Sequence, residues 1–287
     1  MNRVWTTARL FGGLGNQLFQ YAAGRAVAER TGTKLRLDAC YVEIEPDRHY
    51  ELNHFRIRAK VLREPPRPVI GYTQLDVEQR YAEERYGATI CREWAHEFQD
   101  ELAAAQPNSF LVGYWQSEKY FAHLREPLRR ELRPRHLSRP ARAAAKRVAA
   151  SPAAVAVHVR RGDYVEDPVK LRNHGICSPE YYEQAAAIVG EQVDGAEYFV
   201  FSDDPDWCRQ HISLPGQTHH MSGELAGFED MHVMSCCRHW IVANSSFSWW
   251  AAWLGERPDS VIVAPSKWFD EMERDTRDQV PDRWLKI

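Results

Sequence analysis

Two neighbouring arginines follow an apolar segment in the middle of the chain, in the motif HVRRGDY at residues 158–164. A guanidinium presents a planar fork of N–H donors that fits phosphate oxygens, so Arg160 and Arg161 indicate an anionic ligand. Asp163 could orient one arginine by a paired hydrogen bond. The alternative is a structural Arg–Asp ion pair with the second arginine in solvent.

A second polar cluster, NSSFSWW at residues 244–250, lies where a predicted strand meets a predicted helix. Small hydroxyls and backbone N–H groups at a helix start form a cradle for an anion, which would involve Asn244, Ser245, Ser246 and Phe247. The alternative is an ordinary serine N-cap. The two tryptophans are expected in the core under either interpretation.

A glycine-rich turn, GGLGNQLFQ at residues 12–20, opens a predicted helix near the N-terminus. Glycines such as Gly13 and Gly15 let the backbone approach a ligand, and the helix N-terminus beside Asn16 favours an anion. The spacing differs from the G-x-G-x-x-G fingerprint, which argues against dinucleotide binding. A plain turn is the alternative.

An acidic group, SDDPD at residues 202–206, follows another predicted strand. The pair Asp204 and Asp206 resembles the carboxylates that hold Mn²⁺ between nucleotide phosphates in some glycosyltransferases. We favour helix N-capping by Asp203 or Asp204 ahead of Pro205, because the arginines already supply positive charge.

The elements that must position these clusters alternate between strand and helix. Strands are expected at residues 4–11, 34–38, 153–159, 198–201, 240–244 and 260–265, and helices at 16–32, 74–86, 93–105, 141–150, 179–191, 223–238 and 246–256, with a short helix after Pro205. Such alternation predicts parallel sheets covered on both faces, with ligands at the carboxyl ends of the strands.

The length of 287 residues makes about two domains. The Pro- and Arg-rich stretch RPRHLSRP at residues 133–140 marks the expected boundary, between an α/β domain at 1–138 and a second α/β domain at 139–287. We expect the two domains to face a cleft.

Composition excludes several classes of protein. Thirty-seven basic and forty acidic residues give a net charge of −3, which argues against a nucleic-acid binder. No apolar run approaches the ~20 residues of a membrane span, and the first glycines come too early for a secretory signal. Six cysteines without a C-x-x-C pair indicate a reduced, cytoplasmic protein.

Taken together, these segments resemble the α-1,2-fucosyltransferase family, glycosyltransferase family 11. The resemblance rests on GGLGNQLFQYAAG (12–24), YELNHF (50–55), GYWQSEKYF (113–121), HVRRGDYV (158–165), FSDD (201–204), EDMHVMSCC (229–237) and IVANSSFSWWAAWL (241–254). Residues 59–110 match the family least, and RHW at 238–240 departs from its pattern.

The resemblance implies a GT-B-type fold of two Rossmann-like α/β domains. Residues 139–287 would bind GDP-fucose, and residues 1–138 would form the acceptor side. The implied reaction needs no metal or other cofactor and inverts the anomeric carbon. Its acceptor is the 2-hydroxyl of a galactose, commonly in a terminal β-galactoside.

The family pattern also implies roles for individual residues. Arg160 would stabilise the charge that develops on the departing β-phosphate, with His158 beside it and Asp163 orienting the arginines. Asp230 would bind the guanine ring. The remaining nucleotide contacts would come from Arg161, Asn244, Ser245, Ser246 and Phe247, and, from the N-terminal side, Gly13, Gly15 and Asn16.

The general base that accepts the acceptor's proton stays open among Glu166, Asp167 and Asp38, or no dedicated base is present. One rival interpretation is another sugar-nucleotide transferase that uses Mn²⁺ through Asp204 and Asp206. A second rival is a non-catalytic glycan- or nucleotide-binding protein. The expected role is synthesis of surface glycan, such as lipopolysaccharide O-antigen, or of oligosaccharides. The enzyme would lack an integral membrane segment, and peripheral contact with a lipid-linked acceptor stays open.

Overall fold

The chain divides into two α/β units between Arg133 and Pro134, five residues before the expected boundary. The computed structural model describes residues 4–42, 48–64, 74–162, 167, 171–172, 175–221, 224–269 and 275–287. The N-terminal unit contains residues 1–133, and the C-terminal unit contains 134–276 and 280–287. Residues 277–279 return to the N-terminal unit, which the sequence did not predict.

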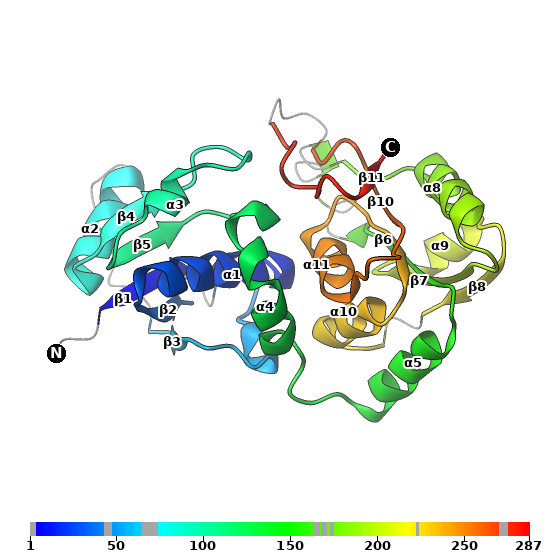
Figure 1. Ribbon diagram of the computed structural model, residues 1–287, viewed down its shortest axis with the longest axis horizontal. Coiled ribbons are helices and arrows are strands. Elements are labelled where there is room, and N and C mark those ends of the chain that lie inside the picture. The colour runs from blue at the N-terminus through cyan, green and yellow to red at the C-terminus, as the bar shows by residue number, and fades with distance from the viewer. Residues whose placement is uncertain are drawn as a thin grey trace. The chain divides into compact units, whose positions relative to one another are not determined.

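The N-terminal unit is built on a five-stranded parallel sheet in the order β3-β2-β1-β5-β4 (Figure 1). Its strands are β1 (Trp5–Arg9), β2 (Lys34–Asp38), β3 (Lys60–Leu62), β4 (Thr89–Arg92) and β5 (Ser109–Val112). Its helices are α1 (Leu14–Thr31), α2 (Gln74–Tyr86), α3 (Glu101–Ala104) and α4 (Arg125–Glu131), with 3₁₀ turns η1 (Leu52–His54), η2 (Glu118–Tyr120) and η3 (Ala122–Leu124).

Helices α1 and α2 cover opposite faces of this sheet. On the α1 face, a Cβ added at Gly24 would lie 2.8 Å from a methyl of Leu35 and 3.1 Å from Ala8, so the glycine allows close approach of helix and sheet. On the α2 face, Tyr81 packs against Phe110 of β5. Ala8 and the neighbouring Arg9 alternate between the two faces, as strand geometry requires.

The C-terminal unit contains a six-stranded parallel sheet in the order β11-β10-β9-β6-β7-β8 (Figure 1). Its elements are α5 (Arg139–Ala150), β6 (Ala154–Val159), α8 (Pro179–Gln192), β7 (Glu197–Ser202), α9 (Pro205–His211), β8 (Gln217–His220), α10 (Gly227–Ser235), β9 (His239–Ile241), α11 (Ser246–Gly255), β10 (Ile262–Ala264) and β11 (Leu285–Lys286).

This second sheet is also covered on both faces. Every residue of β6 is buried, which explains why its sequence AVAVHV is apolar at consecutive positions rather than at alternate ones. Helices α8 and α9 share a core with Val157 and Ile241 on one face. On the other face, the indole N–H of Trp240 donates to the carbonyl of Met234 in α10 at 2.9 Å, and α10 packs against α11.

Most of the predicted elements are confirmed, and the errors concentrate in residues 59–110. The helix predicted at 93–105 is wrong, because only residues 101–104 of this stretch are helical. Strand β4 ends at Arg92, directly before the stretch begins. Strands β3, β4, β5, β8 and β11 were not predicted. Four of these five are edge strands and β5 lies next to one, and all five are only two to four residues long, so they carry little apolar periodicity.

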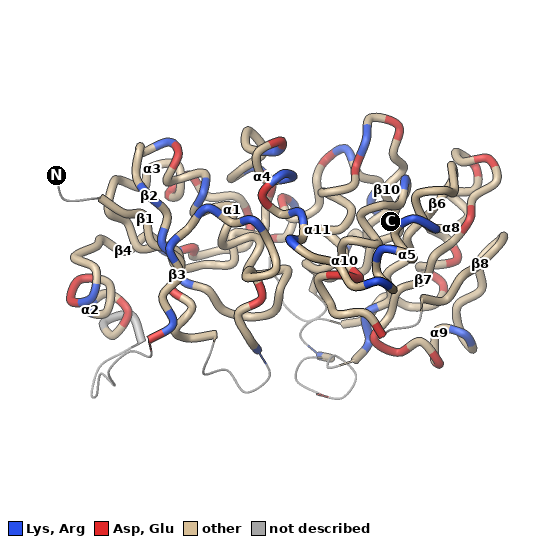
Figure 2. Tube along the Cα trace, turned by 90° about the horizontal axis from the view of Figure 1, so that it is seen from below, with Lys and Arg blue, Asp and Glu red and all other residues tan. Residues whose placement is uncertain are grey.

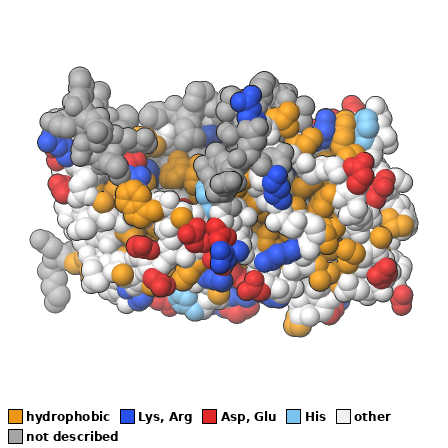
Figure 3. Space-filling view, turned by 90° about the horizontal axis from the view of Figure 1, so that it is seen from above, with side chains coloured by type: hydrophobic (Ala, Val, Ile, Leu, Met, Phe, Trp, Pro, Cys, Tyr) orange, Lys and Arg blue, Asp and Glu red, His pale blue; other side chains and the backbone are white. Residues whose placement is uncertain are grey.

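The distribution of charged residues over the surface agrees with the near-balanced charge of the sequence. Acidic and basic residues are interspersed along the trace of both units (Figure 2), and hydrophobic side chains lie among polar ones on the face drawn in Figure 3. Trp249, Trp250 and Trp253 are buried together, as expected for the tryptophans of the Ser-rich motif. Among the described residues, no helix is long and apolar enough to span a membrane.

Candidate active site

Three of the predicted clusters meet at the carboxyl edge of the C-terminal sheet. The arginine motif follows β6, the acidic motif follows β7 and the Ser-rich motif follows β9, and β6 pairs with both of the other strands. Because all three strands are parallel, their ends lie at one edge, where ligands bind in open α/β sheets.

An ion-pair network joins the arginines to the acidic motif. The Arg160 Nη1 donates to Asp203 Oδ2 at 2.6 Å, and the backbone N–H of Arg161 donates to Asp203 Oδ1 at 2.9 Å. Asp203 therefore orients Arg160, in the role that was expected for Asp163. Asp163 itself lies outside the described residues.

The side chain of Arg161 is held by Asp204 and Trp207. Its Nε donates to Asp204 Oδ2 at 3.2 Å, and its guanidinium carbon lies 3.7 Å from the ring centroid of Trp207 in α9. A cation over an indole face is a stabilising contact. Arg161 thus holds the start of α9, and its predicted contact with the nucleotide is not favoured by this geometry. Arg160 is the arginine that a phosphate would meet.

Gly162 leaves space for this network. A Cβ added there would lie 2.6 Å from Asp203 Oδ2 and 3.0 Å from its carboxyl carbon, closer than real Cβ atoms approach. Any larger residue would displace the carboxylate that orients Arg160. The glycine of the HVRRGDY motif is therefore explained by close packing.

His158 is buried next to Phe247, with their ring centroids 5.5 Å apart. Burial, together with the positive charge of Arg160, lowers the pKa of His158 to about 3. The imidazole is neutral at physiological pH, so it can exchange hydrogen bonds but cannot supply charge to a phosphate. Its Nδ1 is buried and has no hydrogen-bond partner among the described residues.

The acidic motif acts as a helix cap. Asp204 accepts a hydrogen bond from the backbone N–H of Trp207 at 3.1 Å, as an N-cap does, and Pro205 occupies the first turn of α9. Asp206 is 85% exposed at its side chain and pairs with Arg209 one turn later. Among the described residues, no group of three or more His, Cys, Asp or Glu side chains is arranged to hold a metal ion.

The Ser-rich motif places Ser245 at the N-cap of α11 without a side-chain cap bond. The first N–H that closes the helix is that of Trp249, which donates to the carbonyl of Ser245 at 3.1 Å. The N–H groups of Ser246 and Phe247 belong to the first turn, where no intrahelical acceptor exists. The ordinary serine cap is thus not formed, and the helix start can donate to an anion.

Asn244 is bonded to the loops that surround the end of β9. Its Nδ2 donates to the carbonyls of Gly175 and Trp268, both at 3.4 Å, and its Oδ1 accepts from the thiol of Cys177 at 3.6 Å. The side chain is 5% exposed. Asn244 therefore ties together the loops around the end of β9 and supports the serine cluster that follows it, and its contact with the nucleotide stays a prediction.

Two adjacent carboxylates in α10 differ in burial and in hydrogen bonding. Glu229 is buried and accepts from the backbone N–H of Ser138 at 2.6 Å and from its hydroxyl at 3.2 Å, which fixes the start of α5. Asp230 is half-buried, and its carboxylate has no hydrogen bond or ion pair among the described residues. Burial and the charge of Glu229 raise the pKa of Asp230 to about 6.

The N-terminal unit carries the glycine-rich turn at the carboxyl end of β1. Gly12 has φ +74°, a conformation that favours glycine, and Gly13 is the N-cap of α1, with Gly15 buried in its first turn. The carboxylate of Glu51, from the YELNHF motif, lies against the N–H of Leu14, so the protein's own anion occupies part of this helix start.

Asn16 is held by a glutamine relay. The Nε2 of Gln116 donates to Asn16 Oδ1 at 2.7 Å, and the Nε2 of Gln279 donates to Gln116 Oε1 at 3.2 Å. Gln116 comes from the GYWQSEKYF motif and Gln279 from the segment that returns to this unit. The bond from Gln116 fixes the orientation of the Asn16 amide, and its Nδ2 lies over Gly12, 2.6 Å from where a Cβ of that residue would be.

Glu93 clamps the turn that carries Gln116. The backbone N–H of Tyr114 donates to Glu93 Oε2 at 2.6 Å, and that of Trp115 donates to both carboxylate oxygens at 3.0 Å. Trp115 has φ +56°, which is uncommon for a residue with a side chain, and these bonds stabilise it. Burial raises the pKa of Glu93 to about 7 against the effect of the two N–H groups.

Comparison with known proteins identifies the family. The model of glycosyl transferase family 11 matches residues 1–287. The chain belongs to glycosyl transferase family 11. It is 31% identical over 294 residues to an alpha-1,2-colitosyltransferase of Escherichia coli, with 98% of each chain covered. The resemblance seen in the sequence motifs is thereby confirmed.

Two further family 11 relatives are more distant. The O-antigen biosynthesis glycosyltransferase WbnK of Escherichia coli is 28% identical over 289 residues, covering 91% of this chain and 93% of WbnK. The galactoside alpha-(1,2)-fucosyltransferase 1 of Saimiri boliviensis boliviensis is 27% identical over 264 residues, covering 88% of this chain and 66% of the relative.

Solved structures confirm the predicted GT-B-type fold of this family 11 chain. NodZ alpha-1,6-fucosyltransferase soaked with GDP-fucose superposes with a TM-score of 0.50 at 18% identity, covering 88% of this chain and 93% of NodZ. Arabidopsis thaliana FUT1 in complex with GDP gives a TM-score of 0.50 at 14% identity, covering 91% of this chain and 70% of that one.

Of the candidate bases, Asp38 is excluded by its environment. It is fully buried, and its Oδ2 accepts from the hydroxyls of Tyr81 at 2.7 Å and Tyr86 at 2.9 Å. Asp167 is half-buried, and Glu166 lies outside the described residues. The general base of this family 11 chain therefore stays open between Glu166, Asp167 and a reaction without a dedicated base.

Several residues of this site were missed by sequence reasoning. Each of them holds another part of the site in place and has no motif of its own. Asp203 orients Arg160, and Glu51 bonds to the glycine turn. Asn16 is held by Gln116, which is supported in turn by Gln279 and by the turn that Glu93 clamps. Asp203 had a detectable signal, because it follows β7 at the position that mirrors Arg160 after β6.

Proposed function

We propose that this family 11 glycosyltransferase transfers L-fucose from GDP-fucose to the 2-hydroxyl of a galactose in a β-galactoside, with inversion and without a metal ion. The observation that carries the proposal is Arg160, held by Asp203 at the end of β6 beside the open start of α11. A fixed cation and a helix N-terminus together fit a pyrophosphate.

The chemistry follows from the charge that the leaving group develops. GDP departs with additional negative charge on its β-phosphate, and a preorganised guanidinium stabilises that charge without reorganising during the reaction. The N–H groups of Ser246 and Phe247 would share it. Neutral His158 would contribute a hydrogen bond and pack the loop against Phe247.

Asp230 would select the base of the nucleotide. A carboxylate accepts from the N1–H and the amino group of guanine together, while adenine presents no such pair of donors. A half-buried carboxylate with no partner among the described residues is poised for that interaction, because the ligand replaces the water it has lost. In the N-terminal unit, Asn16 with Gly13 and Gly15 would contact the fucose and β-phosphate.

The linkage and acceptor rest on the relatives. An alpha-1,2-colitosyltransferase and a galactoside alpha-(1,2)-fucosyltransferase share the α-1,2 linkage in their names, and WbnK is named for O-antigen biosynthesis. We infer the same linkage and a surface glycan, such as O-antigen, as the product. Cytoplasmic location and peripheral contact with a lipid-linked acceptor stay predictions.

The colitosyltransferase relative favours a second donor. Colitose is fucose without its 3-hydroxyl, so the same GDP site could carry either sugar. A site that forms a hydrogen bond to the 3-hydroxyl of fucose would reject GDP-colitose, because colitose would leave that buried polar group of the protein unpaired. A site without such a bond would accept both donors.

The test measures GDP release from GDP-fucose and from GDP-colitose, with and without lactose, in the presence of EDTA. Lactose-dependent release from GDP-fucose that persists in EDTA, with an α-1,2 linkage in the product by NMR, is the expected result. Loss of activity in EDTA would instead indicate a metal held by Asp204 and Asp206. Preference for GDP-colitose would reassign the donor, and tight binding without turnover would indicate a binding protein.

Two arginine variants test the mechanism in the same assay. Arg160→Ala is expected to lower kcat by roughly 10²-fold or more while the protein stays folded. Arg209→Ala is the matched control, because among the described residues Arg209 pairs with the exposed Asp206 of α9 and forms no other ion pair. Near-wild-type turnover of Arg160→Ala would contradict the assignment.

A further inference from the structure

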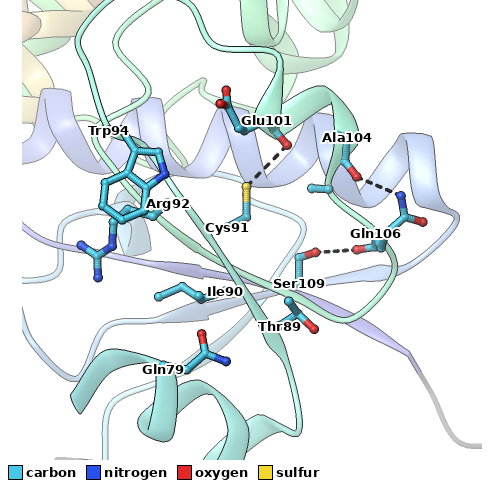
Figure 4. A pocket seen from close by; sticks show the side chains of 11 residues that line it. Gln79, Thr89, Ile90, Cys91, Arg92, Trp94, Glu101, Ala104, Gln106 and Ser109 are labelled. Carbon is cyan, nitrogen blue, oxygen red and sulfur yellow. Dashed lines mark hydrogen bonds between the residues drawn. The ribbon is translucent and has the colours of Figure 1, made fainter. Parts of the chain in front are cut away.

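A pocket of about 520 Å³ lies along the outer edge of β4 in the N-terminal unit (Figure 4). Gln79 of α2 lines one side of it, Glu101 of α3 lines the other, and the strand residues 89–92 lie between them. β4 is the outermost strand of its sheet and pairs only with β5 among the described strands. The volume is within the range of small-ligand sites.

The backbone of β4 presents hydrogen-bonding groups to this pocket. The N–H of Thr89 donates to the carbonyl of Asn108 at 3.2 Å, and that of Glu93 donates to Val112 at 2.9 Å, so alternate residues face β5. Ile90 and Arg92 therefore turn their N–H and C=O groups outward, and these groups have no partner among the described residues. A ligand there must both donate and accept.

Trp94 stands at one end of the pocket and is 67% exposed. It is the only exposed residue among the ten tryptophans, all of which are described. Its backbone N–H donates to Gln99 Oε1 at 2.9 Å, and the guanidinium carbon of Arg92 lies 5.5 Å from the centroid of the indole ring. These contacts hold the residue in place, and most of the indole stays exposed. An exposed indole offers an apolar face with polar groups around it.

We propose that this pocket binds a neutral oligosaccharide, namely the sugars of the acceptor beyond the galactose that reacts. The proposal rests on the function proposed above. A pyranose has an apolar C–H face that stacks on an indole, and hydroxyls that donate and accept. These hydroxyls match the outward groups of Ile90 and Arg92 and the side chains of Gln79 and Glu101. Arg92 is already ion-paired with the buried Glu78 of α2, and the charge of Glu101 disfavours an acidic ligand, which fits an uncharged sugar.

The position of the pocket relative to β4 supports this assignment. Trp94 directly follows Glu93, which clamps the turn at the carboxyl edge of the sheet, where an acceptor is expected. From that end the pocket extends along β4 toward Thr89 and Gln106. A glycan whose terminal galactose lies at the carboxyl edge could therefore continue into it.

An extended peptide that pairs with the strand edge is the competing occupant. Only two residues of β4 turn outward, and α3 stands beside them, so a peptide would gain few backbone hydrogen bonds. The single exposed indole at the end of the pocket also suits a sugar ring better than a run of alternating side chains. The observations favour the oligosaccharide.

The experiment compares lactose with lacto-N-neotetraose, a tetrasaccharide that ends in the same β-galactose. The tetrasaccharide is expected to bind the full-length protein more tightly than lactose. Trp94→Ala is expected to raise KM for the tetrasaccharide about tenfold, with kcat, KM for GDP-fucose and kinetics on lactose changed less than about twofold. Trp94→Phe is expected to restore most of the loss, and Leu285→Ala is the control for an exposed apolar residue of the other unit.

Equal losses on lactose and the tetrasaccharide, or no loss on either, would overturn the subsite. Isothermal titration keeps the result separate from transfer activity. If no galactoside is fucosylated but wild type binds the tetrasaccharide and Trp94→Ala binds it tenfold more weakly, the subsite stands and the proposed function fails. If wild type binds the tetrasaccharide no better than lactose, the subsite fails.

Hydrogen exchange tests the strand edge directly. The tetrasaccharide, and not lactose, is expected to slow exchange at the amides of Ile90 and Arg92. If an octapeptide of alternating Thr and Val protects these amides and the tetrasaccharide does not, the edge binds a peptide strand and the proposal is wrong.

Discussion

Replacing Asp230 by Asn is expected to stabilise the unliganded protein and to weaken GDP binding. Burial, with the charge of Glu229, raises the pKa of Asp230 from 3.8 to about 6. Two pKa units correspond to about 3 kcal/mol, and because the side chain is only half-buried we expect a gain of about 1–2 kcal/mol in the free energy of unfolding.

The sign of the pH dependence follows from proton binding. Between about pH 4 and pH 6 the folded protein binds the Asp230 proton more tightly than the unfolded chain does, so stability falls as pH rises through this window and remains lower above it. The Asn variant is therefore more stable than wild type above pH 6, and the difference disappears near pH 4.

The two measurements are denaturant unfolding and titration with GDP at pH 5 and pH 7–8. Loss of a charged hydrogen-bond pair is expected to weaken GDP binding about 10- to 100-fold at pH 7–8. Because the phosphate of GDP also titrates, the readout is the ratio of the two Kd values, which should shrink about tenfold at pH 5 as Asp230 becomes protonated.

A matched control lies one residue away. Glu229→Gln removes the charge that accepts from Ser138, so it is expected to destabilise the protein by about 1–2 kcal/mol. If Asp230→Asn destabilises the protein at pH 8, or if its ratio of Kd values is the same at pH 5 and pH 8, the assignment of an unpartnered guanine-binding carboxylate is refuted.

Three further variants test the remaining contacts. Gly162→Ala is expected to lower kcat at least about tenfold with little loss of stability, because the new Cβ displaces Asp203; unchanged kcat would contradict the packing argument. His158→Leu is expected to remove about 2–3 kcal/mol of acid sensitivity at pH 4.5 in denaturant unfolding. In wild type the folded imidazole stays neutral to about pH 3, so stability is lost as pH falls below 6.5, and equal acid sensitivity in the variant would argue against this. Gln116→Ala is expected to raise KM for GDP-fucose about tenfold through misplacement of Asn16. Gln106→Ala changes the pocket along β4 instead, so KM for GDP-fucose should stay unchanged in that variant.

The elements that were predicted well are those whose burial leaves a signal in the sequence. All six residues of β6 are buried and apolar or histidine, and α8 begins with a serine cap and a proline at its first position. By contrast, β4 is a four-residue edge strand that is only partly buried, and its sequence TICR has no period that distinguishes it from a helix.

The site was predicted to the extent that each residue acts alone. Arg160 follows a recognisable strand, so its place at the end of that strand could be predicted from its motif. Its partner Asp203 lies 43 residues away, and the pairing depends on which strands are neighbours. Once β6 and β7 are known to be adjacent, the register that aligns Val159 with Ser202 sets Arg160 opposite Asp203. Single-sequence patterns do not contain that adjacency.

The return of residues 277–279 to the N-terminal unit affects how family 11 enzymes could be recombined. The backbone passes between the units three times, and Asp278 accepts from Lys119 and from the backbone N–H of Phe98 at 2.9 Å, while Gln279 supports Gln116. A chimaera joined at one point near residue 133 would combine the N-terminal unit of one enzyme with the return segment of another. Exchange of an intact N-terminal unit therefore requires residues 277–279 to be transferred together with residues 1–133.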